Sequence, residues 1–385
     1  MIEPRLRFKA DDGSDFPDWE EKRLEDVVEF LDEKRKPLEA GKRVAGKYPY
    51  YGASGIIDYV EDYIFDEELI LLSEDGANIL DRNYRVCFLA KGKYWVNNHA
   101  HVMKAKKGNL NYFICEELET FDYRKYNSGG AQPKLNQASC RSIVVKIPSL
   151  PEQQKIADFL STIDTIIEKQ QATVSAWEER KKGVMQKLFS QEVRFKADDG
   201  SDFPDWEEKK MTDLFTRIVE KNRTDLPALT IIQGQGTVRR DESDRRISYD
   251  SKGLKNYKVV RKDNFIVHLR SFEGGLEIAN QDGIVSPAYH VYQGNANVNP
   301  KFYYPYFRSN NFIRGHLAIC VTGVRDGKNI EMNAFDELLL PCPSLPEQQK
   351  IADCLSALDA VIEKQKETLE KWQELKKGLL QQMFV

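Results

Sequence analysis

The chain has few features that would place it in a membrane or in an oxidising compartment. None of its 385 residues falls in an apolar run near the roughly 20 residues that a membrane-spanning helix needs. The first residues include no apolar segment typical of a secretory signal. The six cysteines are scattered and form no Cys-x-x-Cys pair. This spacing argues against a disulfide framework and a thiolate metal site, and it predicts a protein of the reducing cytoplasm.

Motifs for catalysis are also missing. None of the four Gly-Lys pairs is followed by Ser or Thr, so the chain has no P-loop. These pairs begin at Gly41, Gly46, Gly92 and Gly327. The single Asn-Pro pair, at Asn299, lacks the Pro and aromatic residue that follow it in amino-methyltransferases. The net charge of −4 gives no clear indication of a nucleic-acid partner. We expect no catalytic site.

Two weak motifs allow other interpretations. The segment Pro17–Lys22 (PDWEEK), repeated at Pro204–Lys209, superficially resembles a motif of metal-dependent nucleases. All its residues lie within one short segment beside a predicted helix start, whereas nucleases usually bring such residues together from separate elements. His99 and His101 alternate on a predicted strand and could face a metal, but no third ligand is evident. Structural histidines and a non-catalytic acidic segment are the favoured interpretations.

What the chain does contain is an internal repeat. Residues Arg7–Lys22 (RFKADDGSDFPDWEEK) recur unchanged as Arg194–Lys209, and Ser149–Asp158 (SLPEQQKIAD) recur as Ser344–Asp353. The sequences between these shared blocks hardly match. The chain is therefore predicted to hold two different domains in one symmetric frame.

Each SLPEQQKIAD block is followed by a stretch without proline that predicts a long helix. These stretches are Ile156–Phe189 and Ile351–Phe384. A serine, with glutamate three residues later and proline between them, predicts a capping box at each helix start. The serine–glutamate pairs are Ser149 with Glu152 and Ser344 with Glu347.

Apolar residues recur alternately four and three residues apart along both predicted helices, which is the pattern of a coiled-coil seam. The first seam contains Ile156, Leu160, Ile163, Ile167 and Trp177, and the second contains Ile351, Leu355, Leu358, Ile362 and Trp372. Gln170 and Gln365 interrupt the seams at equivalent positions, where a polar residue usually specifies register. Pairing of the two helices is the favoured arrangement, and packing of each helix on its own domain is the alternative.

The repeat also predicts the direction of that pairing. Joining Val385 to Met1 would nearly recreate the internal junction between the two copies, as if the chain were a cut circle. A circle of two equal units has a pseudo-two-fold axis, and this axis makes the helices antiparallel. A helix of about 38 residues spans roughly 57 Å, so the pair would form a spacer.

The variable regions have the composition of mixed α/β (α+β) domains. Short runs of aromatic and β-branched residues, separated by Gly, Asn and Asp, predict strands in both regions. Each region also contains one predicted helix, around Leu110–Lys125 and around Pro300–Leu317. We therefore divide the chain into a first domain (1–148), a first helix (149–190), a second domain (191–343) and a second helix (344–385).

These features together closely resemble the specificity subunit of type I restriction-modification systems. The resemblance covers essentially the whole chain, and its most specific part is the doubled SLPEQQKIA element with its helix. Several further segments resemble the target recognition domains of that family. These segments are Tyr48–Val60, Glu74–Ile79, Asn97–Lys106, Gly283–Tyr292 and Thr322–Ile330.

The resemblance implies a non-catalytic subunit. Each recognition domain would read one half of a bipartite, asymmetric target in double-stranded DNA. The helices would set the spacer length and dock two methyltransferase subunits, and restriction subunits would join the full complex. The chain itself would bind no cofactor, because S-adenosylmethionine belongs to the methyltransferase subunits and ATP and Mg²⁺ belong to the restriction subunits. A coiled-coil scaffold with protein-binding ends is the alternative.

Candidate DNA contacts follow from residue chemistry. Arg pairs with guanine, Asn and Gln pair with adenine, and Lys neutralises phosphates. The candidates in the first domain are Tyr51, Ser54, Lys104, Lys106, Lys107, Gln132, Lys134 and Asn136. The candidates in the second domain are Gln233, Gln235, Arg239, Arg240, Arg325, Lys328 and Asn329. Solvated charged loops and turn residues are the alternative interpretation of these positions.

Overall fold

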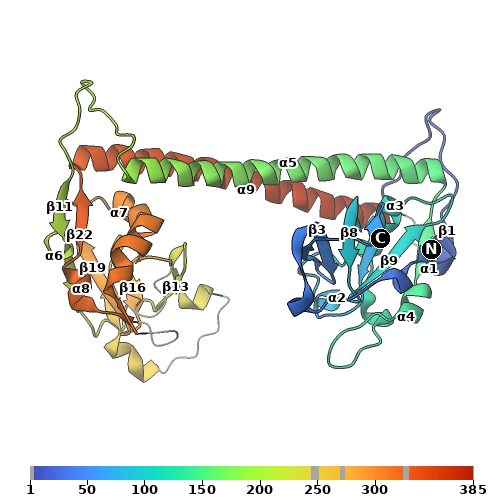
Figure 1. Cartoon of the computed structure of the whole chain (residues 1–385), viewed down its shortest axis with the longest axis horizontal. Coiled ribbons are helices and arrows are strands. Elements are labelled where there is room, and N and C mark those ends of the chain that lie inside the picture. Colours follow the sequence, from blue (N-terminus) through green and yellow to red (C-terminus); the bar gives the residue numbers. More distant parts are fainter. Residues whose placement is uncertain (1–3, 244–250, 269–273, 324–328, 385) are drawn as a thin grey trace. The chain divides into compact units, whose positions relative to one another are not determined.

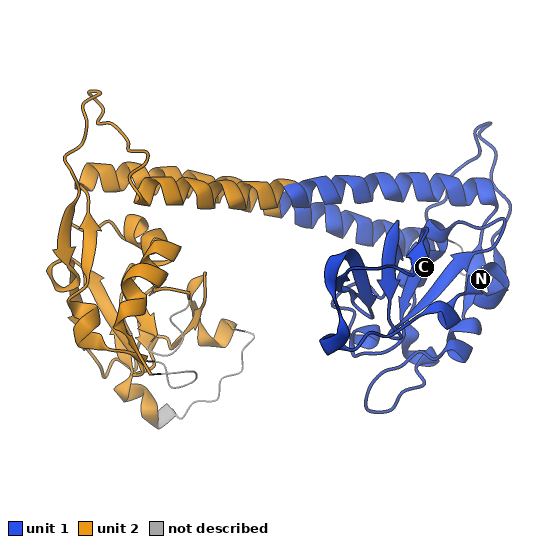
Figure 2. Ribbon diagram, viewed as in Figure 1, with its two compact units in different colours: residues 1–172, 367–385 blue, residues 173–366 orange. Residues whose placement is uncertain are grey.

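The computed structural model describes residues 4–243, 251–268, 274–323 and 329–384, and it forms two compact units (Figures 1 and 2). Unit 1 contains Met1–Ala172 and Glu367–Val385, and unit 2 contains Thr173–Lys366. The long helices α5 (Leu150–Phe189) and α9 (Leu345–Phe384) have 40 residues each. Each helix is divided between the two units, with one part in unit 1 and the other part in unit 2.

Two four-stranded sheets form the globular part of unit 1. The first has the antiparallel order β2 (Val28–Phe30), β9 (Ala100–Ala105), β6 (Leu69–Ser73), β7 (Cys87–Ala90). The second has the order β4 (Gly55–Val60), β3 (Ala45–Gly52), β8 (Lys93–Val96), β5 (Phe65–Asp66), in which β3 and β8 are parallel. Smaller elements are β1 (Glu20–Arg23), β10 (Val144–Ile147), α1 (Leu24–Val27), α2 (Asn78–Asp81), α3 (Asn111–Thr120) and α4 (Gln137–Arg141).

The central strand β6 explains how the core of unit 1 is divided. Its run Leu-Ile-Leu-Leu is fully buried, and successive side chains of a strand point to opposite faces. Ile70 and Leu72 therefore join the larger core, which includes α3, whereas Leu69 and Leu71 join a second core between the two sheets. A continuous apolar run is typical of a strand that is covered on both faces.

Unit 2 repeats the first of these sheets. Its four-stranded sheet has the antiparallel order β12 (Phe215–Ile218), β19 (Tyr289–Gly294), β16 (Phe265–His268), β17 (Glu277–Ile278). Two-stranded pairs are β11 (Glu207–Lys210) with β22 (Leu339–Cys342), β13 (Leu229–Ile232) with β14 (Gly236–Arg239), β15 (Lys258–Val260) with β18 (Gly283–Val285), and β20 (Val321–Thr322) with β21 (Asn329–Ile330). Its short helices are α6 (Met211–Leu214), α7 (Pro300–Phe307), a π-helical segment (Asn311–Leu317) and α8 (Met332–Asp336).

The strand registers align the two sheets residue by residue. Met103 of β9 pairs with Phe30 and Ile70. Tyr292 of β19 pairs in the same way with Arg217 and Phe265. Met103 and Tyr292 are therefore equivalent, and so are the histidines two residues before them, His101 and His290.

The helices are antiparallel within each unit. In unit 1 the buried Ile156, Leu160 and Ile163 at the start of α5 share a core with Met383 and Phe384 at the end of α9. In unit 2 the start of α9 shares a core in the same way with the end of α5. This arrangement confirms the predicted antiparallel pair. The alternative, in which each helix packs on its own domain, is also partly right, because the first turns of each helix pack on a globular domain.

The other predicted seam residues lie along the same helix faces. In unit 1, Ile167 and Trp372 are half-buried against the core. In unit 2, Ile351, Leu355 and Ile362 are buried, and Leu358 is half-buried against the core. Trp177, Gln170 and Gln365 are half-buried.

The predicted capping boxes are wrong. The hydroxyls of Ser149 and Ser344 are buried and have no hydrogen-bond partner. Glu152 and Glu347 are fully buried, and each receives an arginine of the preceding repeat block instead. The local pattern did not account for this arginine, which comes from a segment more than 140 residues away in the sequence.

The arginine–glutamate pair is the same joint in both units. Arg7 donates from Nε and Nη2 to the two carboxylate oxygens of Glu152, at 3.0 and 2.9 Å. It also donates from Nη2 to the carbonyl oxygen of Pro17 at 2.7 Å. Arg194 and Glu347 have the same two distances, 3.0 and 2.9 Å. Identical sequence blocks therefore produce identical joints around dissimilar domains.

The acidic PDWEEK segments lie beside helix starts, as predicted, because α1 and α6 begin two residues after them. The strands that come before these helices were not predicted: the last residues of the segments open β1 and β11, which pair with β10 and β22 respectively. The partner strands lie more than 100 residues further along the chain, so local propensity could not indicate this pairing. The helices predicted near Leu110–Lys125 and Pro300–Leu317 are confirmed, although α3 and α7 are shorter than expected.

Candidate nucleic-acid interface

Four turns and loops of unit 1 meet at one end of its central strands, which we call the unit 1 edge. They are Gly52–Gly55, Glu74–Ala77, Asn97–His99 and Ser128–Asn136. The Ser73 hydroxyl at the end of β6 donates to the carbonyl oxygen of Ala53. The amide of Leu135 donates to the carbonyl oxygen of Glu74 at 2.7 Å. Backbone hydrogen bonds therefore hold these segments together.

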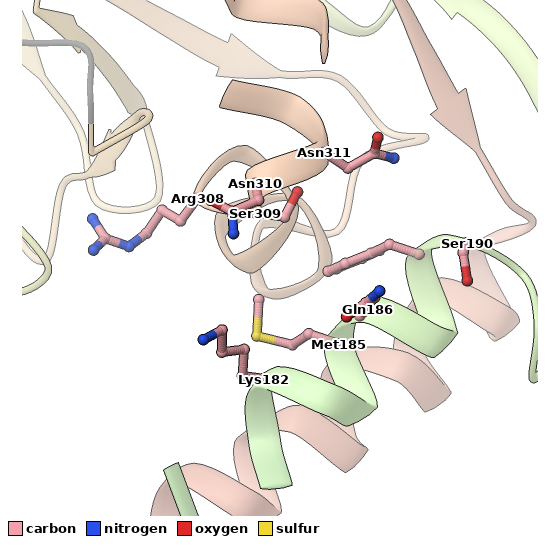
Figure 3. Close-up of a pocket in the computed structure, with 9 residues that line it drawn as sticks. Lys182, Met185, Gln186, Ser190, Arg308, Ser309, Asn310 and Asn311 are labelled. Carbon is pink, nitrogen blue, oxygen red and sulfur yellow. The ribbon is translucent and has the colours of Figure 1, made fainter. Parts of the chain in front are cut away.

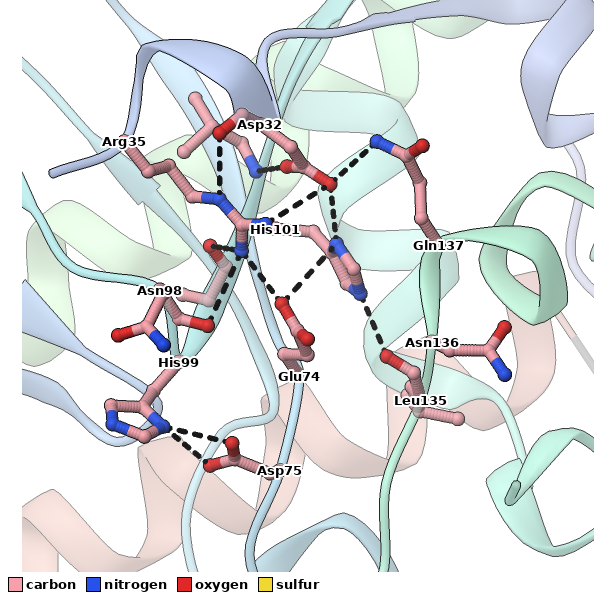
Figure 4. A network of polar contacts seen from close by, with 12 residues as sticks. Asp32, Arg35, Glu74, Asp75, Asn98, His99, His101, Leu135, Asn136 and Gln137 are labelled. Atoms are coloured by element: carbon pink, nitrogen blue, oxygen red, sulfur yellow. Dashed lines mark hydrogen bonds and ion pairs between the residues drawn. The ribbon is translucent and has the colours of Figure 1, made fainter. Parts of the chain in front are cut away.

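A buried ionic network lies beneath the unit 1 edge (Figure 4). His101 is 1% exposed, and its Nδ1 and Nε2 lie 2.7 Å from Asp32 Oδ2 and 2.8 Å from the Leu135 carbonyl oxygen. Both neighbours are acceptors, so both ring nitrogens carry a proton and the imidazole is charged. Arg35 donates to Glu74 at 2.7 Å in the same network.

The environment shifts the pKa of His101 strongly. Burial is the largest single effect and lowers the pKa, but the hydrogen bonds and charges of Asp32 and Cys140 together outweigh burial and raise the pKa to about 10. Burial raises the pKa of Asp32, but His101, the Val102 amide and the Arg35 charge together outweigh burial and lower the pKa. The positive charges of the network therefore balance its negative charges, and the network supports the loops above it.

This network predicts a pH dependence of stability. The pKa of His101 is higher in the folded chain than its ordinary value of 6.5, so its contribution is complete below pH 6.5 and is lost as the pH rises toward 10. Between pH 8 and 10 the free energy of unfolding should fall by about 2 kcal/mol more in the wild type than in Asp32→Asn. Denaturant unfolding at the two pH values measures this difference.

The window from pH 8 to 10 excludes the titration of a second buried group, Glu117. Burial raises the pKa of Glu117 to about 8, so the stability lost on its ionisation is lost between pH 4.5 and 8. Above pH 8 its contribution changes little. Equal slopes for the wild type and Asp32→Asn would show that the Asp32–His101 pair does not stabilise the fold.

The metal interpretation of the histidines finds no support in the geometry. His99 binds Asp75 at 2.8 Å on the exposed side, whereas His101 turns inward to Asp32. Within the described residues, no group of three or more His, Cys, Asp or Glu side chains could hold a metal ion.

Four unit 1 candidates lie at the unit 1 edge. Ser54 and Gln132 are exposed in their turns, and the ammonium of Lys134 lies 3.3 Å from Glu74. Asn136 accepts a hydrogen bond from the Ser139 amide and so caps α4. The structure thus brings together residues from sequence segments about 80 residues apart.

The remaining unit 1 candidates lie elsewhere. The Tyr51 ring lies against Phe88 and Tyr94, with centroids 5.9 and 5.5 Å away, and burial raises the pKa of its hydroxyl. Lys104, Lys106 and Lys107 lie at the other end of β9, away from the unit 1 edge. The candidates therefore do not form one surface.

Unit 2 places its candidates around the β13–β14 hairpin. Gln233 and Gln235 are exposed in the turn. Arg239 donates to Asp241 at 2.9 Å, and the Arg240 guanidinium lies 5.6 Å from the centre of the Tyr257 ring. These two arginines are thus held by neighbours from their own unit.

The last three candidates lie further along unit 2. Asn329 is exposed on β21. Arg325 and Lys328 lie outside the described residues.

A cluster of basic side chains that the sequence analysis did not select lies on β12, β15 and β19. It contains Arg217, Lys258 and His290, with Lys221 next to them. Alignment of the repeat would have given one signal: the position of Arg217 in unit 2 is that of Phe30 in unit 1, a change from an apolar to a charged side chain on a central sheet.

Each unit also has a pocket between a long helix and its globular domain, and we call these the helix-end pockets. Figure 3 shows the pocket of unit 2. The unit 2 pocket has a volume of about 600 Å³ and the unit 1 pocket about 930 Å³. Three helix residues of each lining occupy equivalent repeat positions. They are Lys182, Met185 and Gln186 on α5, and Lys377, Leu380 and Gln381 on α9.

The domain side of the helix-end pockets is also equivalent in position but not in charge. The last turn of α3 contributes Glu119, and the end of α7 contributes Arg308. The constant helix surface is therefore combined with a variable domain surface.

Comparison with protein families matches both repeats. The family described as "Type I restriction modification DNA specificity domain" matches residues 17–175 and 204–371, which is most of the chain. The chain belongs to this family. No helix among the described residues is long and apolar enough to cross a membrane.

Relatives of this specificity family align along nearly the whole chain. A type I restriction enzyme specificity subunit of Methanocaldococcus jannaschii, MjaVIII, is 25% identical over 94% of this chain and 92% of its own length. A putative specificity subunit of Haemophilus influenzae is 36% identical, but the match covers only 38% of this chain and 37% of that protein. The crystal structure of a type I S subunit from M. genitalium has a TM-score of 0.58 at 13% identity, covering 100% of this chain and 99% of the other. That likeness supports the fold.

Proposed function

We propose that the chain is the subunit that gives a type I restriction-modification complex its DNA sequence specificity. Each unit reads one half of a bipartite, asymmetric target in double-stranded DNA. The observation that carries this proposal is the combination of identical joints, such as Arg7 with Glu152, and dissimilar loop surfaces. The two units share the same joints but differ in their loop surfaces, so they suit a target whose two halves differ in sequence.

The long helices have two roles in this proposal. Their paired seams set the number of base pairs between the half-sites, and they dock two identical methyltransferase subunits. The helix-end pockets support the second role, because α5 and α9 present the same residue positions to a partner in each unit. Two equivalent surfaces suit two copies of one partner.

The chain itself performs no chemistry in this proposal. S-adenosylmethionine is bound by the methyltransferase subunits, and ATP and Mg²⁺ are bound by restriction subunits in the full complex. The six cysteines are free, which suits the reducing cytoplasm of a prokaryote.

Exchange of one recognition domain tests this proposal. The chain is expressed with its methyltransferase partner, and methylated adenines are mapped across the host genome. Replacing Asp18–Pro148 by the corresponding segment of another specificity subunit should change one half-site completely and leave the other unchanged, because the β11–β22 frame and unit 2 are untouched. The reciprocal exchange of Asp205–Pro343 is the matched control.

Two outcomes would contradict the proposal. Methylation without any reproducible sequence would indicate a scaffold with protein-binding ends. A domain exchange that altered both half-sites would contradict the assignment of one half-site to each unit.

A further inference from the structure

The basic cluster of unit 2 brings four basic side chains together without an acidic partner among the described residues. Its members are Arg217, Lys221, Lys258 and His290. Arg217 Nη2 lies 3.4 Å from His290 Nε2, and Lys258 donates to the carbonyl oxygen of Tyr289 at 2.5 Å. Lys221 and Lys258 form a backbone bridge. None of the four is in an ion pair with a carboxylate of the described residues.

The proximity of these groups has a free-energy cost. Burial, followed by the charges of Arg217 and Lys258, lowers the pKa of His290 to about 4. Burial, followed by Arg217 and Lys221, also lowers the pKa of Lys258. Like charges that lower each other's pKa destabilise the folded chain unless an anion compensates them. The cluster therefore has no negative partner in the part of the chain that the structure describes.

One atom of the cluster is also without a hydrogen bond. His290 is neutral at pH 7, and its Nε2 faces a guanidinium, which can only donate. The ring proton is therefore assigned to Nδ1. Nδ1 is buried and has no partner among the described residues. An unsatisfied buried donor destabilises the folded chain, so the environment of His290 is incomplete in this structure.

Unit 1 indicates which chemical group is missing. His101 is equivalent to His290, and its Nδ1 binds a carboxylate oxygen of Asp32 at 2.7 Å. Asp32 is the second residue after Phe30, and the second residue after the equivalent Arg217 is Val219. Val219 is 68% exposed and carries no charge. Unit 1 thus supplies its own anionic oxygen, whereas unit 2 has none at that position and has an additional arginine.

We infer that Arg217, Lys258 and His290 form an anion site that binds a phosphate group of the DNA backbone. Lys221 adds charge at the rim. This inference rests on the proposed function, because it assigns the anion to DNA. Arginine and lysine are the side chains that most often contact DNA phosphates, and Arg217 is exposed while Lys258 is half-buried. His290 lies behind Arg217 and would sense the bound anion through it. Phosphate contacts of this kind position a protein on DNA and do not read its sequence.

The first experiment measures DNA affinity against salt. The variants are Arg217→Gln with Lys258→Gln, and the charge-matched control is Arg223→Gln with Lys262→Gln. Both control residues lie in unit 2 outside the cluster; Lys262 is exposed, and Arg223 is half-buried and paired with Asp225. Loss of about two phosphate contacts should make the slope of log K against log[NaCl] less negative by between 1 and 2. It should also weaken binding of a short duplex about 10-fold at low salt. Circular dichroism confirms that both proteins are folded.

The second experiment observes the site directly. The five histidines of the chain are labelled, and His290 is titrated by NMR alone, with inorganic phosphate, and with a duplex. An anion beside the imidazole favours its charged form, so bound duplex should raise the pKa of His290 above its value near 4. A rise with duplex supports the inference. A rise with inorganic phosphate alone would limit the site to a free ion and overturn its assignment to DNA.

Failure of this inference can be distinguished from failure of the proposed function. Sequence-specific methylation together with cluster and control variants of equal salt slope would overturn the phosphate site and leave the proposed function intact. A reduced slope for the cluster variant alone, in a protein that directs no reproducible methylation, would support the phosphate site and contradict the proposed function.

Discussion

Replacement of Arg7 by Ala is expected to lower the free energy of unfolding of unit 1 by about 3 kcal/mol, because it leaves the Glu152 carboxylate buried without its partner. Glu152 is 0% exposed, and both of its oxygens accept from Arg7. For a unit of this size the midpoint of thermal unfolding should fall by about 6–12 °C. Differential scanning calorimetry measures the transition.

Two matched variants test the physical reason. Lys9→Ala removes an exposed ion pair of the same block and should cost less than about 0.5 kcal/mol. The double variant Arg7→Ala with Glu152→Leu should recover part of the loss, because no uncompensated charge remains. A loss for Arg7→Ala no larger than that for Lys9→Ala would show that the joint is not a main source of stability. Arg194→Ala should have the same effect on unit 2.

Insertion of one heptad into both long helices is expected to lengthen the target of the complex by about three base pairs. Seven residues add about 10.5 Å to a helix, and base pairs are stacked about 3.4 Å apart. Insertions after Lys169 and Lys364 lie next to Gln170 and Gln365, at equivalent positions, and retain the 3.5-residue seam. Mapping of methylated adenines measures the new spacer, and both half-sites should be unchanged.

Insertion of four residues at the same two points is the matched control. Four residues rotate the following helix face by about 40°, so the seam of each helix no longer faces its partner, and methylation should be lost or strongly reduced. An unchanged spacer after the heptad insertion would contradict the ruler role of the helices. Altered half-site bases would contradict the separation of reading from spacing.

The sequence predicted the repeated elements well because their signals are local or duplicated. The seam residues Ile156, Leu160 and Ile163 recur with helical spacing, and the structure places all three in a buried helix face. The capping boxes failed for a physical reason. Serine and glutamate have the correct spacing, but the charge-assisted bonds from Arg7 to Glu152 are stronger than a cap and come from another part of the chain.

The candidate DNA contacts show a similar limit. Residue type identified Lys134 and Lys104 as equally good phosphate ligands. The structure places them at opposite ends of the central strands, because β9 runs between them. The basic cluster around Arg217 was not selected, since its residues are separated in sequence and only the sheet register brings them together.

The sequence by itself determined the two-fold frame, the antiparallel direction of the helices and the family, since these depend on exact repetition and on a regular apolar period. Only the tertiary structure decided what fills the frame. It placed Asp32 beside His101, and it placed His290 beside Arg217 with no carboxylate partner among the described residues. Such differences arise from strand pairing between distant segments, and pairing is set by the free energy of the whole packed unit, which no local pattern encodes.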